Sequence, residues 1–259
     1  MEQNRAIRVE KLRAGYGKKT ILHDMTFAIT SGQWCVLLGP NGSGKSTLMK
    51  TLMGMLISSG GEAAILGLEC FKERREVKKR VGYVSEEPYL YSNLNAVQHL
   101  RFAGDMHCVP KKELIERIER LLDFFDLKDA ARQRLSEYSM GMKRKVELSM
   151  ALIHNPRVLI LDEPLNGLDP ITAKTCRVLL RDLCDREDKT ILMSTHNLGM
   201  MHDYCDRLIV ISNGAILAND SPADLCEKYP GQSIEEIFLD LVGVSLDDKK
   251  LTLSQPEEL

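Results

Sequence analysis

The stretch that decides the fold is GPNGSGKST, residues 39–47. It satisfies the pattern G-x-x-x-x-G-K-[ST] with Gly39, Gly44, Lys45 and Ser46. Glycines let the backbone wrap closely around phosphate oxygens, and backbone N–H groups at the start of a helix form an anion site. Lys45 would place positive charge at the β- and γ-phosphates, and the Ser46 hydroxyl would hold Mg²⁺. The stretch therefore predicts a site for a nucleoside triphosphate.

The segments on either side have the character that this pattern requires. WCVLL, residues 34–38, is an apolar run before the loop, and KSTLMKTLMGML, residues 45–56, places leucines at helical spacing after it. By chance, about one chain in a hundred of this length would match the pattern. A chance match that also has a strand before it and a helix after it is rarer. The residues expected at the nucleotide are Gly39, Pro40, Asn41, Gly42, Ser43, Gly44, Lys45, Ser46 and Thr47.

Three further apolar runs indicate strands of a buried sheet. They are VLILD at 158–162, TILMSTH at 190–196 and RLIVIS at 207–212. Continuous runs of this kind suit parallel strands that helices cover on both faces. Nearer the N-terminus, AIRVEKL and TFAIT also read as strands, separated by turns that contain glycine. Strands that alternate with helices predict an α/β fold.

Helical patterns occupy two other parts of the chain. Between about 88 and 150 the chain reads as a helical insertion, in which Pro110 opens the segment KKELIERIERLLDFFDL with one apolar face. That face consists of Leu114, Ile118, Leu121, Leu122 and Phe125. Close to the C-terminus, SIEEIFLDLVG at 233–243 has the same periodicity and is expected to be a docked helix.

Two acids follow the apolar run directly in VLILDEP. A carboxylate at the carboxyl end of a central strand reaches the Mg²⁺ beside a phosphate loop. We therefore expect Asp162 to orient the metal and Glu163, pointing the other way, to act as general base on the attacking water. His196 ends the next apolar run in the same way and is expected near the γ-phosphate. The competing interpretations are acids that only cap a strand before Pro164, and a structural histidine.

Composition argues against several classes of function. The 259 residues carry a formal net charge of -2, which does not favour binding of nucleic acid by general electrostatics. No stretch approaches the roughly 18 consecutive apolar residues that span a membrane, and the charged N-terminus lacks the apolar core of a signal peptide. None of the seven cysteines forms a C-x-x-C pair, so neither a zinc site nor a disulfide framework is expected. We expect an intracellular chain, and any membrane role would need a partner that spans.

The last motif is YSMGMKRK, residues 138–145, which sets Ser139 and Gly141 before a basic tail that looks exposed. A serine hydroxyl and a glycine N–H at a helix N-terminus make an anion site. Taken in order, the phosphate loop, YSMGMKRK, LILDEP, NGLDP and STH resemble the ATPase subunit of ABC (ATP-binding cassette) transporters over roughly residues 5–225. The resemblance implies a P-loop ATPase with a mainly parallel central sheet, an N-terminal antiparallel β subdomain and an α-helical subdomain insertion. It divides the chain into an ABC ATPase domain over 1–230 and a C-terminal helix and polar tail over 231–259.

The resemblance also implies roles for single residues. Ser139 and Gly141 would bind the γ-phosphate of an ATP held by a second cassette, which is a copy of this chain or a paralogue. Tyr16 matches the aromatic residue that stacks on adenine. Asp169, in NGLDP, matches the loop acid that crosses the dimer interface, and His196 matches the switch histidine that contacts the γ-phosphate.

Two positions depart from the family pattern. Met140 stands where a second glycine is usual, so its side chain must point away from the nucleotide, while Ser139 and Gly141 keep the phosphate contacts. Glu86, in VGYVSEEP, stands where glutamine is usual and can still ligate Mg²⁺ as a charged oxygen ligand. The implied cofactors are ATP and Mg²⁺, and the expected metal ligands are Ser46, Glu86 and Asp162.

The implied partner is a separate transmembrane transporter subunit, with no nucleic acid. SEEP, YSMGMKRK and SIEEIFLDLVG resemble subunits that serve exporters and antibiotic- or peptide-efflux systems. In the family, a groove beside Glu86 receives a cytoplasmic helix of the membrane subunit, and Tyr89, Leu90 and Tyr91 would line it, unless they are ordinary loop packing. The chain is therefore expected in the cytoplasm, peripheral on the inner face of the cell membrane.

One other function stays open, that of a soluble cassette ATPase acting on ribosomes or DNA. Such relatives usually carry two cassettes in one chain, an iron–sulfur cysteine cluster or a long coiled coil, and the sequence has none of these marks. The basic run KERREVKKR at 72–80 is interpreted as a solvated helix face, with contact to lipid headgroups as the alternative.

Overall fold

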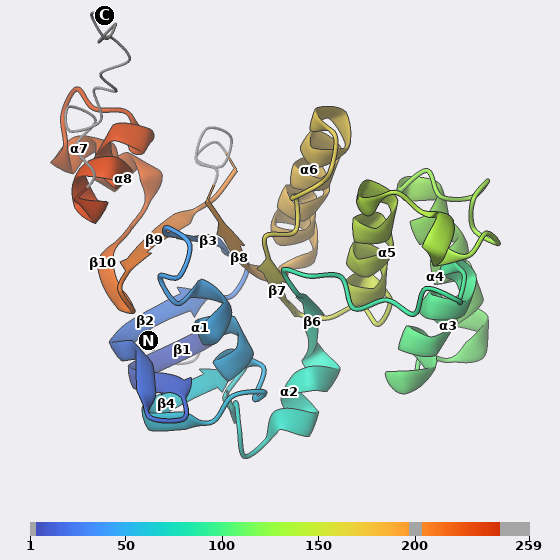
Figure 1. Cartoon of the computed structure of the whole chain (residues 1–259), viewed down its shortest axis with the longest axis horizontal. Coiled ribbons are helices and arrows are strands. Elements are labelled where there is room, and N and C mark those ends of the chain that lie inside the picture. The colour runs from blue at the N-terminus through green and yellow to red at the C-terminus, as the bar shows by residue number, and fades with distance from the viewer. Residues whose placement is uncertain (1–3, 197–203, 244–259) are drawn as a thin grey trace, which may run out of the picture.

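The computed structural model describes residues 4–196 and 204–243 (Figure 1). The strands are β1 Arg5–Tyr16, β2 Lys19–Thr30, β3 Trp34–Leu38, β4 Ser58–Ile65, β5 Leu68–Glu69, β6 Val81–Val84, β7 Val158–Asp162, β8 Thr190–Thr195, β9 Arg207–Ser212 and β10 Ala215–Asp220. The helices are α1 Lys45–Leu52, α2 Arg74–Arg80, α3 Ala96–Met106, α4 Lys111–Phe124, the 3-10 turn η1 Leu135–Glu137, α5 Met140–Leu152, α6 Pro170–Glu187, α7 Pro222–Lys228 and α8 Ile234–Val242.

The central sheet has the strand order β10-β9-β3-β8-β7-β6. β3 pairs in parallel with β8 and β9, β7 pairs in parallel with β6 and β8, and β10 joins the edge antiparallel to β9. β3, β7 and β8 are buried along their whole length, which explains their continuous apolar sequences. The prediction of a mainly parallel sheet is confirmed, and its parallel strands end at one common edge.

Each central strand faces two separate cores. Trp34, Val36 and Leu38 of β3 pack into a core shared with the helices after β6, whereas Cys35 and Leu37 pack into a second core under the N-terminal strands. Side chains of a strand alternate between its faces, so one short apolar run serves both cores. The central sheet thereby lies between two packed layers.

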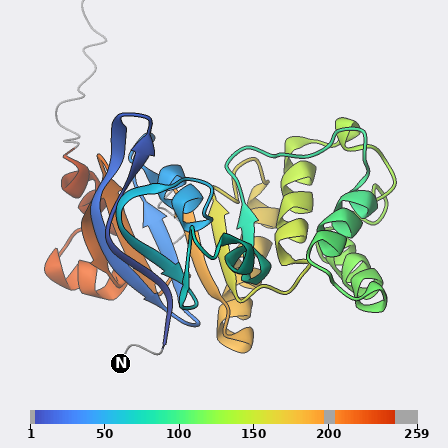
Figure 2. The ribbon, with the colours of Figure 1, turned by 90° about the horizontal axis from the view of Figure 1, so that it is seen from below.

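The N-terminal strands form a second sheet, in the order β2-β1-β4-β5. β1 pairs antiparallel with both β2 and β4. Figure 2 shows these strands, in blue to cyan, on the side of the molecule away from the green helices. The predicted N-terminal antiparallel β subdomain is confirmed.

The helices α3, α4 and α5 group to one side of the sheets, where an insertion was expected (Figure 1). Asn95 caps α3 with a capping box that Gln98 completes. On α4, the predicted apolar face is buried through Leu114, Ile118 and Leu122. We call α3, α4 and α5, together with the connections between them, the helical lobe.

The first helix ends earlier than its sequence pattern predicted. The pattern ran from 45 to 56, but α1 stops at Leu52. Gly54 has φ 62, outside the helical region, and its Cα lies so close to the Cys70 carbonyl that an added Cβ would stand 2.4 Å from that oxygen. The chain must therefore turn at Gly54, and it does so before the leucine periodicity ends.

The C-terminal helices pack on the first of the two cores. Ile234 and Ile237 of α8 are buried in it, and Phe238 and Leu241 are partly buried against it, so the predicted docked helix is confirmed. The polar tail after Val244 lies outside the described residues. In the described ranges, no helix combines the length and apolar character needed to cross a membrane.

Candidate functional site

A cavity of about 330 Å³ lies at the carboxyl edge of the central sheet. Its lining combines the phosphate loop with residues from both sheets and from the segment after β6. The lining residues are Tyr16, Lys19, Ile21, Asn41, Gly42, Gly44, Lys45, Ser46, Thr47, Glu86, Asp162 and Glu163. Parallel strands carry their carboxyl ends to the same edge, so β6 and β7 bring Glu86, Asp162 and Glu163 beside the loop that follows β3.

The phosphate loop has the backbone that its glycines predict. Gly42 and Gly44 have φ values of 78 and 109, in the region that favours glycine. The Lys45 ammonium group donates to the carbonyl oxygens of Gly39 at 2.7 Å and Pro40 at 3.2 Å, which orients its charge without neutralising it. Burial lowers the pKa of Lys45, and the carboxylate of Glu163, the largest opposing influence, raises it. A cation held in this way suits an anionic ligand.

Asp162 and Glu163 are both buried and share one hydroxyl group. The Ser194 Oγ donates to Asp162 Oδ1 at 2.6 Å and accepts from the Glu163 backbone N–H at 2.9 Å. Asp162 and Ser194 are register partners on β7 and β8. Glu163 itself has φ 48, a left-handed conformation at the point where the strand ends. The Ser194 hydroxyl thus fixes the backbone between the two acids.

Glu163 and His196 are in direct contact. The His196 Nδ1 lies 2.8 Å from Glu163 Oε1, and about half of the histidine side chain is exposed. Burial raises the pKa of the Glu163 carboxyl, and its hydrogen bond to His196 acts in the opposite direction. A carboxylate with a raised pKa beside an imidazole has the character of a general base.

The predicted metal ligands offer oxygen atoms around one side of the loop. Ser46 Oγ lies 3.5 Å from Glu86 Oε2, and Asp162 lines the same cavity. One hydroxyl and two carboxylates are hard oxygen donors, which is the donor set that Mg²⁺ prefers. The residues present therefore fit this ion. Tyr16 also lines the cavity and is 50% exposed.

Seven predicted residues are absent from this lining: Gly39, Pro40 and Ser43 of the phosphate loop itself, His196, and Ser139, Gly141 and Asp169. The last three lie on another part of the chain. Ser139 caps α5, and its Oγ accepts from the Met142 N–H at 3.2 Å. Asp169 caps α6 in the same manner, accepting from the N–H groups of Ile171 and Thr172. Gly141 lies beside the loop before α6, since a Cβ added to it would stand 3.0 Å from the Gly167 carbonyl oxygen.

The side chain of Met140, which departs from the family pattern, is 60% exposed. It lies at the start of α5, beside the Ser139 cap. More than half of this residue is therefore accessible at the start of α5 in the single chain.

Sequence reasoning missed three residues close to the site. Ser194 sits inside the apolar run TILMSTH, where a lone polar residue was the available signal. Arg144 and Glu147 lie on α5, and both are buried. The basic tail of YSMGMKRK was expected to be exposed, and for Arg144 that expectation is wrong, because its guanidinium group is turned onto the chain after β6.

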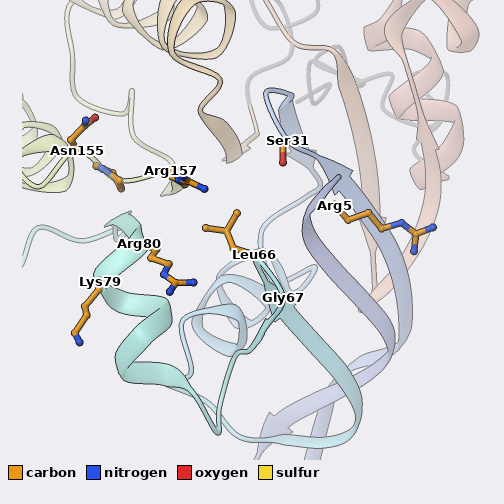
Figure 3. A pocket seen from close by; sticks show the side chains of 9 residues that line it. Arg5, Ser31, Leu66, Gly67, Lys79, Arg80, Asn155 and Arg157 are labelled. Atoms are coloured by element: carbon orange, nitrogen blue, oxygen red, sulfur yellow. The ribbon is translucent and has the colours of Figure 1, made fainter. Parts of the chain in front are cut away.

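A larger cavity, of about 730 Å³, lies elsewhere (Figure 3). It lies at the amino ends of β6 and β7, where Arg80 and Arg157 precede the two strands. Figure 3 shows the side chains of Arg5 and Lys79 pointing away from it. None of the predicted nucleotide residues lines this hollow, so the size of a cavity does not locate the site here.

Comparison with known proteins identifies the family of this arrangement. The family profile described as ABC transporter matches residues 22–166. The chain is 31% identical over 231 residues to the linearmycin resistance ATP-binding protein LnrL of Bacillus subtilis (strain 168), covering 89% of this chain and 74% of that protein. It is 35% identical over 233 residues to the Nod factor export ATP-binding protein I of Rhizobium sp. (strain N33), covering 90% and 76%.

A solved structure of the ATP-binding subunit of an ABC transporter superposes with a TM-score of 0.85 at 30% identity, covering 91% of this chain and 99% of that one. The predicted family and fold are thereby confirmed. The chain belongs to the ABC transporter family, as an ATP-binding and ATP-hydrolysing subunit that drives transport through a separate transmembrane subunit.

Proposed function

We propose that the subunit closes with a second cassette around ATP and Mg²⁺, and that this closure drives export of a substrate through its membrane partner. One observation carries the proposal. The phosphate loop, Asp162 and Glu163 gather in one cavity, while Ser139 and Gly141 lie on another part of the chain. A second cassette is the partner that brings such a segment to the open side of the nucleotide.

The catalytic roles follow from the contacts at the cavity. The loop N–H groups and Lys45 bind the phosphates, and Ser46, Glu86 and Asp162 would hold Mg²⁺. When bound, Mg²⁺ neutralises charge on the phosphate oxygens. Glu163 accepts the proton of the water that attacks the γ-phosphorus, and the bond from that phosphorus to the leaving oxygen of ADP breaks.

His196 would position this base. With a proton on Nδ1, the imidazole donates to Glu163 Oε1 and fixes the direction of the carboxylate. About half of the His196 side chain is exposed, so it would be accessible to a γ-phosphate and to the second cassette. Asp169 and Ser139 cap their helices, and both residues are exposed. The N-termini of these two helices would therefore meet the second cassette.

A groove of about 310 Å³ between the sheets and the helical lobe is the proposed docking site of the membrane subunit. It is lined by Met53, Met55, Lys78, Val81, Tyr83, Phe102, Ala103, Met106, His107, Met150, Ala151 and His154. Met55, Phe102 and Met106 are between 47 and 69% exposed, which is unusual for large apolar residues on one surface. An apolar helix face of the membrane subunit fits such methionine-rich walls.

The residues first expected to line the docking groove lie beside this cavity. Tyr89, Leu90 and Tyr91 are absent from its lining, and Leu90 is partly buried against the core. Tyr91 still borders the groove, because its ring meets Phe102 edge-on at 6.2 Å. The contact of Tyr89, Leu90 and Tyr91 with the membrane subunit therefore stays a prediction, and the set above extends it, with Tyr91 at the rim of the groove.

The direction of transport and the cellular location complete the proposal. The two relatives named above are a resistance protein and an export protein by their names. By analogy we assign this subunit to export and to the cytoplasmic face of the membrane, with its membrane partner. The second cassette is a copy of this chain or a paralogue.

Purification of tagged Glu163→Gln protein from detergent-solubilised host membranes with Mg-ATP present tests this proposal. We expect a stoichiometric membrane protein with many spans, together with two cassettes. Lys45→Ala is the matched control, because it removes the nucleotide that holds the cassettes together while the docking groove stays intact. Recovery with ribosomes or DNA and no membrane protein would overturn the transport role.

A further inference from the structure

A buried arginine on α5 holds the chain segment that carries Glu86. Arg144 is 4% exposed, and its guanidinium group donates to the carbonyl oxygens of Ser85 at 2.6 Å and Glu86 at 2.5 Å. It lies 58 to 59 residues along the chain from these acceptors. A charged side chain is rarely buried unless it is paired and hydrogen-bonded, so this contact is specific.

A buried glutamate completes the arrangement. Glu147 Oε2 accepts from Arg144 at 2.9 Å, and Glu147 Oε1 accepts from the backbone N–H of Tyr89 at 3.2 Å. Arg144 and Glu147 are therefore hydrogen-bonded to both ends of residues 85–89, which we call the Glu86 segment. Three backbone groups of a connection with no regular structure are held by two side chains of one helix.

These hydrogen bonds connect three parts of the molecule: the start of α5, the phosphate loop and the docking groove. The helix that carries Arg144 and Glu147 is capped by Ser139, the residue proposed to meet the ATP of the second cassette. The Glu86 side chain reaches Ser46 of the phosphate loop at 3.5 Å. Just past the segment, Tyr91 contacts Phe102 at the rim of the docking groove.

We infer that Arg144 and Glu147 are positioning residues that set the place of Glu86 at the metal site according to the position of α5. This inference rests on the proposed function for the role of Glu86. When α5 moves as Ser139 engages the second cassette, the two side chains carry the Glu86 segment with them. The same movement displaces Tyr91 at the rim of the groove. The position of α5 therefore determines both the place of Glu86 and the shape of the groove rim.

The competing explanation is that Arg144 and Glu147 only stabilise the fold. A double substitution distinguishes a stabilising role from a positioning role. Replacing both members of a buried ion pair with apolar residues of similar size is often neutral or stabilising, because the cost of removing two charges from water disappears. The Arg144→Met/Glu147→Met double variant should therefore keep its fold. It would leave the Glu86 segment without its three backbone contacts.

Three measurements on the isolated subunit test the inference. We expect the amide protons of Ser85, Glu86, Glu87 and Tyr89 to exchange with deuterium at least about tenfold faster in the nucleotide-free double variant, since the groups that anchor the segment are gone. The Mg²⁺ concentration for half-maximal ATPase activity should rise by about tenfold, as is typical when a partner of a metal ligand is lost. The affinity for ATP without metal should stay unchanged.

The chain offers a matched control pair. Arg117 on α4 donates to the Ile153 carbonyl at 2.7 Å and pairs with Glu113 at 2.6 Å, in the same combination of contacts but away from Glu86. Arg117→Met/Glu113→Met should leave the exchange at 85–89 and the Mg²⁺ requirement unchanged. Equal effects in both double variants, or an unchanged Mg²⁺ requirement in the first, would overturn the inference.

A second comparison holds if the double variant does not fold. Glu147→Gln keeps an oxygen to accept from Tyr89, whereas Glu147→Ala removes it, so the Mg²⁺ shift should be smaller in the glutamine variant. The same shift in both would contradict a positioning role. These results need no membrane protein, so they are independent of whether a membrane partner is recovered with Glu163→Gln.

Discussion

Glu163 meets the requirements of a base through its surroundings. It is buried, its carboxylate is held by His196 and its backbone N–H is held by Ser194. Glu163→Gln keeps the shape of the side chain but removes its basicity. We expect ATP binding to persist and the turnover rate to fall by roughly 100-fold or more, measured by phosphate release. A variant with a near-normal rate would exclude Glu163 as the base.

Ser194 connects the two acids through a single oxygen, so its removal should affect both. Ser194→Ala leaves Asp162 without a donor and the Glu163 N–H without an acceptor. We expect a loss of about 1–3 kcal/mol in the free energy of unfolding, measured in urea, because a buried N–H loses its partner. Ser149→Ala, on α5, removes a hydroxyl that donates only to the Lys145 carbonyl and should cost less.

Single residues were predictable where a spacing fixes their chemistry. Lys45 and Ser46 follow from the loop pattern, and Asp162 and Glu163 follow from the end of an apolar strand. Arg144 was not predictable, because its acceptors are backbone carbonyls far away in the sequence. A basic residue among KRK gives no sign that it alone will be buried.

At the scale of elements, Gly54 decides where α1 ends. Its φ of 62 and its approach to the Cys70 carbonyl leave no room for a side chain. For Gly54→Ala we expect a loss on the order of 2 kcal/mol in the free energy of unfolding, from both strain and displacement of the turn. Gly67→Ala is the control, since it shares a positive φ but has open space around it, and it should cost less. Equal losses would assign the effect to φ alone.

The elements themselves were largely predictable, and their ends were not. Periodicity marks which residues face a core, and it placed the strands β3, β7, β8 and β9 and the helices α4 and α8 correctly. The leucine spacing of α1 continues past the turn, because Leu56 packs against the same core after the helix has ended. A periodic pattern of leucines indicates which residues face the core. Leu56 still faces it, although the helix has already ended.

For the whole molecule, a pair of stacked histidines predicts sensitivity to acid. The rings of His107 and His154 lie 3.6 Å apart at 9°, and burial followed by the charge of His107 lowers the pKa of His154 from 6.5 to about 4. The unfolded chain then binds more protons between pH 6.5 and about 4, so the free energy of unfolding falls as pH decreases through that window. The loss should be on the order of 2 kcal/mol, allowing for a ring that is only partly buried.

Urea unfolding at several pH values between 7 and 4 measures this effect. His154→Phe keeps a flat ring against His107 but cannot take up a proton, so its stability should decline less over the same range. Identical slopes for the two proteins would show that other groups set the acid sensitivity.

The strand order also constrains how the molecule is made. β1 pairs with β2 and β4, which are close to it in sequence, whereas β3 pairs with β8 and β9, which the ribosome supplies more than 150 residues later. Local pairings form early and distant ones slowly, because loop closure costs entropy before contacts repay it. The N-terminal sheet can therefore assemble during synthesis, but β3 must wait, with its apolar residues unpaired, until β8 emerges. A nascent chain that has not yet reached β8 contains the whole phosphate-loop sequence but no folded central sheet to hold it. We therefore expect the nascent chain to depend most on chaperones between the synthesis of β3 and that of β8.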